Sequence, residues 1–163
     1  MPKALPMAGK MALVTGAATE IGVACARAFI AEGASVTLMG GDLDELIGVR
    51  AQLVPLVAPG AVVELFAGDA LDKDDVVAAV ELAVSIHERL DVCISNVRPG
   101  NVRPLLRHDI ASFKGEVDAN VLSAFLLVRY SVEFMAATGG GSIVCLSSVA
   151  AKKAFPWMSA FTA

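Results

Sequence analysis

The sequence predicts an α/β fold in which a parallel sheet of five strands is covered by helices on both faces. Short apolar runs alternate five times with longer segments whose apolar residues recur at the period of a helix. The short runs are almost continuously apolar, which is typical of strands buried on both faces of a parallel sheet. Right-handed crossovers favour a doubly wound, Rossmann-like three-layer sandwich with strand order 3-2-1-4-5.

The first half of the chain is expected to form two strand–helix units and a third strand. Gly33 ends the first helix, since glycine readily adopts the left-handed conformation that closes helices. Asp42 caps the second helix, and Pro55 ends it because proline cannot continue the helical hydrogen bonding. The expected elements, in order, are strand 11–15, helix 21–31, strand 34–39, helix 42–54 and strand 61–66.

The second half of the chain continues the alternation with two further strand–helix pairs. Asp72 is expected to cap a helix in which Val76, Val80 and Val84 recur near 3.6-residue spacing. Three consecutive glycines at 139–141 end a second, longer helix. The expected elements, in order, are helix 72–89, strand 91–95, helix 109–136 and strand 142–147.

Composition and charge narrow the class of protein. The 163 residues fit one domain, and with 13 Lys+Arg against 17 Asp+Glu and no basic cluster we expect no nucleic-acid partner. No uninterrupted apolar run reaches about 18 residues, so we expect no membrane partner. Cys25, Cys93 and Cys145 lie far apart among apolar neighbours, which favours reduced thiols and a cytoplasmic location.

A glycine-containing turn, TGAATEIG at 15–22, joins the first strand to the first helix. A helix that begins here offers unpaired N–H groups and partial positive charge, which suit a pyrophosphate. Gly16 would allow the tight turn, and Gly22 the close packing of helix on strand. A generic tight turn is the alternative interpretation. The candidate cofactor-binding residues of this turn are Thr15, Gly16, Thr19, Glu20, Ile21 and Gly22.

This turn resembles the TGxxxGxG fingerprint of the short-chain dehydrogenase/reductase family, and the resemblance extends along essentially the whole chain. It implies an NAD(P)-binding Rossmann domain that oxidises an alcohol or reduces a carbonyl compound. Glu20 stands at the second glycine of the fingerprint, where the family's backbone approaches the phosphates. A glutamate in the first helical turn interacts favourably with the helix dipole and would repel a bound pyrophosphate.

Three further positions carry the resemblance through the middle of the chain. Asp69 matches the family's acidic residue that contacts adenine, with an ordinary loop or capping aspartate as the alternative. The family's NNAG is SNVR here, so that Asn96 remains and Arg98 replaces the glycine. Asn120 matches the asparagine that helps to position a proton-relay water; the alternative is a solvated helix residue, although asparagine is a poor choice within a helix.

The segment from Ser142 to Ser148 resembles the family's fifth strand, and Ser148 matches the catalytic serine that polarises the substrate carbonyl. The alternative for a serine at a strand end is a capping hydroxyl. The family's catalytic tyrosine follows this serine by about thirteen positions, and that position is Phe161. Phenylalanine has no proton to give, and general acid–base catalysis typically contributes about 10²–10⁴-fold. The family's lysine, four residues further on, would lie beyond Ala163.

Few residues of the sequence indicate which cofactor is preferred or whether a metal is bound. The family's Asp for NAD, or Arg for NADP, belongs where Gly40 and Gly41 stand, and Asp42 follows slightly late. No basic residue precedes Ile21 in the glycine turn. We therefore expect NAD or NADP, with NAD marginally favoured. His87 and His108 have no metal-ligand spacing to Cys, Asp or Glu, and no metal site is predicted.

Two functions remain open from the sequence. The first is an NAD(P)-dependent oxidoreductase for a small alcohol or carbonyl compound, with residues 1–163 as one Rossmann-like domain truncated before the catalytic Lys helix. The second is a non-catalytic member of the family that acts as a binding or oligomerisation partner. In either case we expect a homo-oligomer that associates through the apolar surface of helix 109–136. We also hypothesise an ion pair between Glu20 and Arg98 across the cofactor crevice.

Overall fold

The computed structural model describes residues 5–96, 100 and 102–162. All of its strands are parallel and form one sheet in the order β3-β2-β1-β4-β5, as the sequence predicted. The strands are β1 (Met11–Val14), β2 (Ser35–Gly40), β3 (Val63–Ala67), β4 (Val92–Ser95) and β5 (Ser142–Cys145). The chain order reverses between β1 and β4, so the crevice expected of a doubly wound sheet opens at their carboxyl ends.

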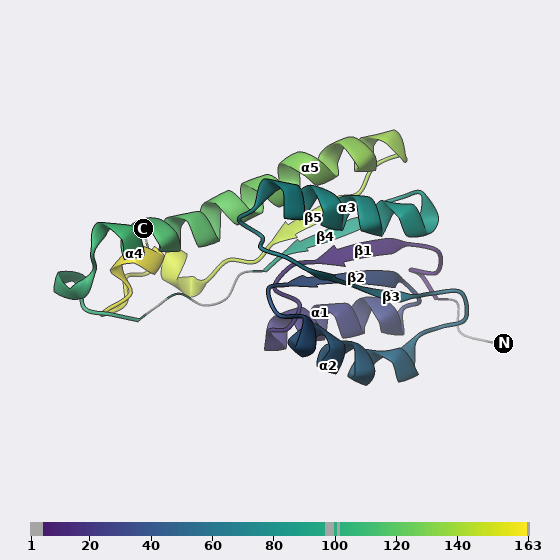
Figure 1. The fold of residues 1–163 in the computed structure, drawn as a ribbon, viewed down its shortest axis with the longest axis horizontal. Coiled ribbons are helices and arrows are strands. Elements are labelled where there is room, and N and C mark those ends of the chain that lie inside the picture. Colours follow the sequence, from purple (N-terminus) through teal and green to yellow (C-terminus); the bar gives the residue numbers. More distant parts are fainter. Residues whose placement is uncertain (1–4, 97–99, 101, 163) are drawn as a thin grey trace.

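Helices cover both faces of the sheet, with α1 and α2 on one side and α3 and α5 on the other (Figure 1). The α-helices are α1 (Glu20–Ala31), α2 (Leu43–Leu53), α3 (Lys73–His87), α4 (Ile110–Val117), α5 (Ser123–Ala137) and α6 (Ser159–Thr162). The 3₁₀ turns are η1 (Val54–Leu56), η2 (Leu105–Arg107) and η4 (Val149–Ala151).

Side-chain caps fix where the helices begin. The Thr19 hydroxyl accepts from the amide of Gly22, and the carboxylates of Asp42, Asp72 and Asp109 cap α2, α3 and α4 in the same way. The helix that starts after Asp72 ends at His87, two residues earlier than expected. Glu88 there adopts a left-handed conformation with φ of 53°, which terminates the helix.

The central strand β1 contributes to two separate apolar layers. Met11 and Leu13 pack with the inner faces of α3 and α5, whereas Ala12 and Val14 pack with α1 and α2. All four residues of β1 are fully buried. This arrangement explains why the strand is continuously apolar, since each successive side chain points to an opposite face that a helix covers.

The expected helix at 109–136 is one helical run with an internal irregularity. Between α4 and α5 lies a π-helical segment, η3 (Asp118–Leu122). By length and composition, the run Ile110–Ala137 resembles a helix that crosses a membrane, although it contains no long uninterrupted apolar stretch. In the fold, Leu127 and Met135 of this run are buried against the sheet and α3. Leu126 is also buried there.

Candidate functional site

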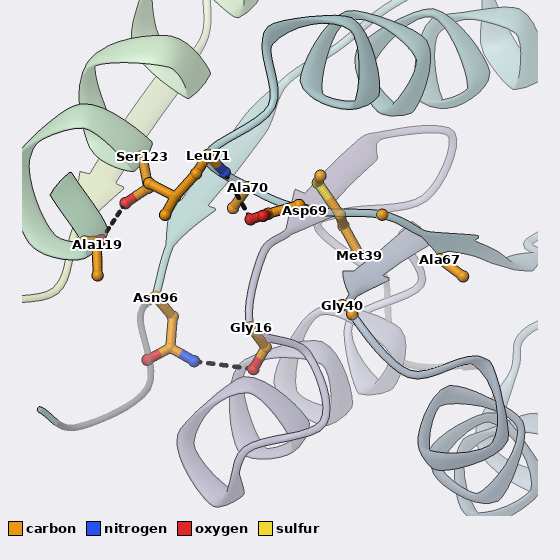
Figure 2. Close-up of a pocket in the computed structure, with 12 residues that line it drawn as sticks. Gly16, Met39, Gly40, Ala67, Asp69, Ala70, Leu71, Asn96, Ala119 and Ser123 are labelled. Carbon is orange, nitrogen blue, oxygen red and sulfur yellow. Dashed lines mark hydrogen bonds between the residues drawn. The ribbon is translucent and has the colours of Figure 1, made fainter. Parts of the chain in front are cut away.

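Asn96 and Thr15 join the ends of β4 and β1 at the crevice. The Asn96 amide nitrogen Nδ2 donates to the Gly16 carbonyl at 3.0 Å (Figure 2). It also donates to the Thr19 hydroxyl at 2.7 Å. The backbone amide of Asn96 donates to the Thr15 hydroxyl at 3.2 Å. Both side chains are nearly fully buried. Together these bonds hold the glycine turn against β4 and fix the direction in which α1 begins.

The two glycines of the turn stand where a side chain would collide with backbone. Gly16 has φ of 57°, and a Cβ on it would meet the carbonyl oxygen of Asn96. A Cβ on Gly22 would lie 2.8 Å from the Cα of Ala17 and closer still to the Gly16 carbonyl. The turn therefore requires glycine at both positions for the packing of α1 on β1.

A cavity of about 500 Å³ opens beside this turn, at the carboxyl ends of the strands (Figure 2). Its lining is Gly16, Met39, Gly40, Gly41, Ala67, Gly68, Asp69, Ala70, Leu71, Asn96, Ala119 and Ser123. Three predicted residues, Gly16, Asp69 and Asn96, meet here. The Asp69 carboxylate accepts from the amide of Leu71 at 2.9 Å, so the aspartate shapes its own loop as well as lining the cavity. We call this cavity the nucleoside pocket, after the adenine contact that the family resemblance implies for Asp69.

A second cavity, of about 520 Å³, borders the α1 N-terminus at Ile21. It brings together all three residues that the family resemblance marks as catalytic: Ser148, Asn120 and Phe161. Its lining is Ile21, Asn96, Asn120, Val121, Leu146, Ser147, Ser148, Ala151, Met158, Phe161 and Thr162. We call this cavity the serine pocket. Asn96 lines both cavities, so they are neighbours across one side chain.

Ser148 and Asn120 each make a local hydrogen bond in addition to lining the serine pocket. The Ser148 hydroxyl accepts from the amide of Ala150 at 3.1 Å and caps η4, so the capping interpretation also holds. Asn120 lies within the π-helical segment, and its Nδ2 donates to the Glu116 carbonyl at 2.8 Å. π-Helical segments within α-helices occur frequently at functional sites.

Phe161 lies half-buried in α6 on the wall of the serine pocket. Its ring presents only carbon and hydrogen there. Of the residues around it, Ser148, Ser147 and Thr162 carry hydroxyl groups, and Asn120 carries an amide. These groups can hold a polar oxygen by hydrogen bonds, but an unperturbed serine or threonine hydroxyl is a far weaker acid than a tyrosine phenol. The pocket is therefore built to bind a polar group more than to protonate one.

Glu20 is the first residue of α1 and is exposed. It lies between Gly16, which lines the nucleoside pocket, and Ile21, which lines the serine pocket. Within the described part of the chain, no hydrogen bond or ion pair involves its carboxylate. The hypothesised partner Arg98 lies outside the described residues.

Several lining residues carry no signal of their own in the sequence. Met39, Ala67 and Leu71 line the nucleoside pocket, and Met158 and Leu146 line the serine pocket. Met39, Ala67, Leu71 and Leu146 lie near strand ends, which the parallel sheet brings to one edge, whereas Met158 directly precedes α6. In the sequence, the one feature that could have pointed to such lining residues is their position directly after a buried strand. Among the described residues, no group of three or more His, Cys, Asp or Glu side chains is arranged to hold a metal ion.

Comparison with known proteins gives related sequences and structures. Short-chain dehydrogenase reductase 5 of Arabidopsis thaliana is 33% identical over 159 residues, covering 95% of this chain and 59% of the relative. A 2-dehydro-3-deoxy-L-rhamnonate dehydrogenase (NAD(+)) of Sphingomonas sp. (strain SKA58) is 32% identical over 157 residues, covering 96% and 60%. A solved 7α-hydroxysteroid dehydrogenase, complexed with NADH and 7-oxo glycochenodeoxycholic acid, has a TM-score of 0.88 at 27% identity, covering 98% and 61%.

The chain thus spans about 60% of the length of these proteins. The family model of the short chain dehydrogenases matches residues 10–163, from the first strand to the segment that carries Phe161. The strand order and the glycine turn agree with that match. The chain belongs to the short-chain dehydrogenase/reductase family.

Proposed function

We propose that the chain is the dinucleotide-binding part of an NAD(P)-dependent oxidoreductase that interconverts an alcohol and a carbonyl group of a small molecule. The observation that carries this proposal is the meeting of Ser148 and Asn120 in one cavity. That cavity adjoins the nucleoside pocket across Asn96. Two adjoining cavities at the carboxyl edge of a doubly wound sheet are the arrangement that an extended dinucleotide requires.

The glycines around the nucleoside pocket support the fit of such a cofactor. Gly16, Gly40 and Gly41 line the pocket, and a Cβ on Gly41 would meet no atom within 4 Å, so the space beside it is open. The residues of the nucleoside pocket would hold the nucleoside, the amides at the N-terminus of α1 would hold the diphosphate, and Ser148 and Asn120 would face the nicotinamide. The bound nicotinamide would supply or accept a hydride.

Ser148 would donate a hydrogen bond to the reacting oxygen of the substrate, and Asn120 would support the polar network behind it. Phe161 supplies no proton at the position where the family has tyrosine. Because positioned acids and bases typically contribute about 10²–10⁴-fold to such reactions, we expect binding with little turnover. The chain is therefore proposed to be an impaired oxidoreductase.

The lining of the nucleoside pocket favours NAD over NADP. None of its residues is Lys or Arg among those that the structure describes, so nothing there would hold the additional phosphate of NADP. The Asp42 carboxylate accepts from the amides of Asp44 and Glu45, and these bonds keep it at the N-terminus of α2. Both the Sphingomonas relative and the steroid dehydrogenase carry NAD or NADH in their descriptions.

A non-catalytic role is the second candidate, and Phe161 is the observation that favours it. In that role the chain would bind other copies or partners through the helical run Ile110–Ala137, several of whose apolar side chains are exposed. We propose a homo-oligomer for either role and a cytoplasmic location.

Burial raises the pKa of the Cys93 thiol to about 12, so this cysteine is unreactive.

Titration of NADH, NADPH and a panel of ketones and aldehydes would test the proposal. We expect NADH to bind at least about tenfold more tightly than NADPH, which corresponds to about 1.4 kcal/mol. Carbonyl reduction should be slow, and Ser148→Ala should abolish the remaining rate without changing NADH binding. Absence of binding by both cofactors would contradict the proposed function. Rapid turnover would instead contradict the proposal that Phe161 impairs proton transfer.

A further inference from the structure

The glycine turn and the start of α1 border both the nucleoside pocket and the serine pocket. Gly16 lines one cavity and Ile21 the other, while Asn96 borders both. The Asn96 side chain is bonded to Gly16 and Thr19, so the chain between the two pockets is held in place. The proposed dinucleotide would pass the first turn of α1 between one pocket and the other.

Glu20 lies within this stretch, and its exposed carboxylate stands on the first residue of α1, where the proposed function places the diphosphate. Its backbone amide and those of its neighbours belong to the first turn of α1, which attracts anions. The exposed carboxylate can itself interact with this partial positive charge. It would therefore compete with a phosphate group for the same field and repel it directly.

The nucleoside pocket itself contains no comparable obstacle. Its single carboxylate, on Asp69, is engaged by the Leu71 amide, and the rest of its lining is glycine, small or apolar residues, Asn96 and Ser123. A neutral nucleoside has no phosphate for Glu20 to repel, and Glu20 does not line this pocket. The negative charge at Glu20 therefore repels the diphosphate of a dinucleotide and leaves the binding of its nucleoside unaffected.

We propose that Glu20 is a specificity-determining residue that makes the chain discriminate against diphosphate-bearing ligands and leaves the nucleoside pocket open to neutral nucleosides. This inference rests on the proposed function, because it assigns the nucleoside pocket to the nucleoside end of the cofactor. The residue acts through charge, since the Glu20 side chain is exposed and the α1 backbone beneath it is already fixed by Asn96.

Calorimetric titration of adenosine, ADP and NAD⁺ into the wild-type chain and three variants would test the inference. Glu20→Gln removes the charge and keeps the size of the side chain, whereas Glu20→Asp keeps the charge. Glu81→Gln removes a carboxylate that is also exposed, from the middle of α3 and outside the lining of both pockets, and is the matched control. Circular dichroism on each variant would verify the fold.

Glu20→Gln should raise the affinity for ADP and NAD⁺ by about tenfold or more, and leave the affinity for adenosine within about twofold. Glu20→Asp and Glu81→Gln should behave like the wild type. Salt screens repulsion between exposed charges. The difference in NAD⁺ affinity between the wild type and Glu20→Gln should therefore become smaller as the salt concentration rises from about 20 mM to 500 mM.

The outcomes separate the two proposals. If adenosine and NAD⁺ bind and Glu20→Gln changes neither, the specificity role of Glu20 is overturned and the proposed function stands. If adenosine and NAD⁺ bind to none of the chains, both proposals fail. An equal gain for adenosine and NAD⁺ in Glu20→Gln would overturn the discrimination, since it would show a general effect on the pocket.

Discussion

The carboxylate of Asp91 connects three parts of the chain at the amino-terminal edge of the sheet. It accepts from the Arg89 Nε at 2.7 Å, from the Met11 amide at 2.9 Å and from the Lys10 ammonium at 3.0 Å. Burial raises the pKa of this carboxyl, but the hydrogen bonds from Arg89, Met11 and Lys10 together outweigh burial and lower the pKa to about 2. The start of β1 is thereby fixed to the start of β4.

Replacement of Asp91→Asn should lower the free energy of unfolding at pH 7 by about 2 kcal/mol. The folded-state pKa of about 2 lies below the ordinary value of 3.8, so the stabilisation is complete above about pH 5. It is lost as the pH falls from about 4 to 2, and the variant should lack this acid-induced loss. Urea unfolding at pH 7 and pH 3 would measure both effects.

The exposed pair Arg129–Glu133, at 2.7 Å, provides the matched comparison for Asp91. Removal of its charge by Glu133→Gln should change the free energy of unfolding by no more than about 0.5 kcal/mol, because solvent screens the pair. Equal costs for Glu133→Gln and Asp91→Asn would refute the claim that the buried network stabilises the sheet edge.

The ring of Phe161 carries no acidic group in the serine pocket. Phe161→Tyr would place a phenol, which is protonated at neutral pH, on the wall that Ser148 and Asn120 share. We expect the rate of carbonyl reduction with NADH to rise by about 10²-fold or more, because the pocket then contains a proton donor. Phe155→Tyr, outside the serine pocket, is the control. If NADH binds and the rate does not rise, proton transfer is not the step that Phe161 impairs.

Among the elements of the fold, α1 depends on close contact with the turn before it. Gly22→Ala would place a methyl group against the Gly16 carbonyl and 2.8 Å from the Ala17 Cα. We expect the free energy of unfolding to fall by about 1–3 kcal/mol. Gly48→Ala, in α2, meets no atom within 4 Å and should instead stabilise by about 0.5–1 kcal/mol. Opposite signs in urea unfolding would support this account, and a neutral Gly22→Ala would contradict it.

The sheet and its strand order could be predicted from the sequence because each strand is marked locally by an apolar run between helical patterns. The glycine turn was equally accessible, since a single short segment contains both Gly16 and Gly22. The π-helical segment at Asp118–Leu122 was not predicted. One extra residue in a helical turn barely alters the apolar period. Its formation depends on contacts from outside the segment, which the sequence pattern does not report.

The two pockets could be predicted only in part, and the reason lies in how each residue reaches its place. Asn96, Asn120 and Ser148 carry polar groups at positions that match a family motif. Met39 and Met158 are apolar residues like many in the core, and they line cavities only because separate strand ends and helices converge. Lining of this kind belongs to the folded chain and has no local signature.

For the molecule as a whole, one long side remains apolar and uncovered. The α4–α5 run extends beyond the end of the sheet (Figure 1). Val121 and Phe125 on it are 63% and 59% exposed. The further exposed apolar residues of the run are Ile110, Phe113, Leu122, Val128 and Val132. Contiguous apolar patches of this kind mark interaction surfaces, and they favour association when nothing covers them.

Sedimentation velocity at increasing concentration would test whether copies of this chain cover that side. We expect the wild type to exceed its monomer mass of 16.8 kDa as concentration rises. Phe125→Glu should weaken association by at least about tenfold, since burial of a phenylalanine contributes about 1.5–3 kcal/mol. Ile47→Glu, at a similarly exposed position on α2, should leave association unchanged. A wild type that stays at the monomer mass at every concentration would show that another partner, or none, occupies this side.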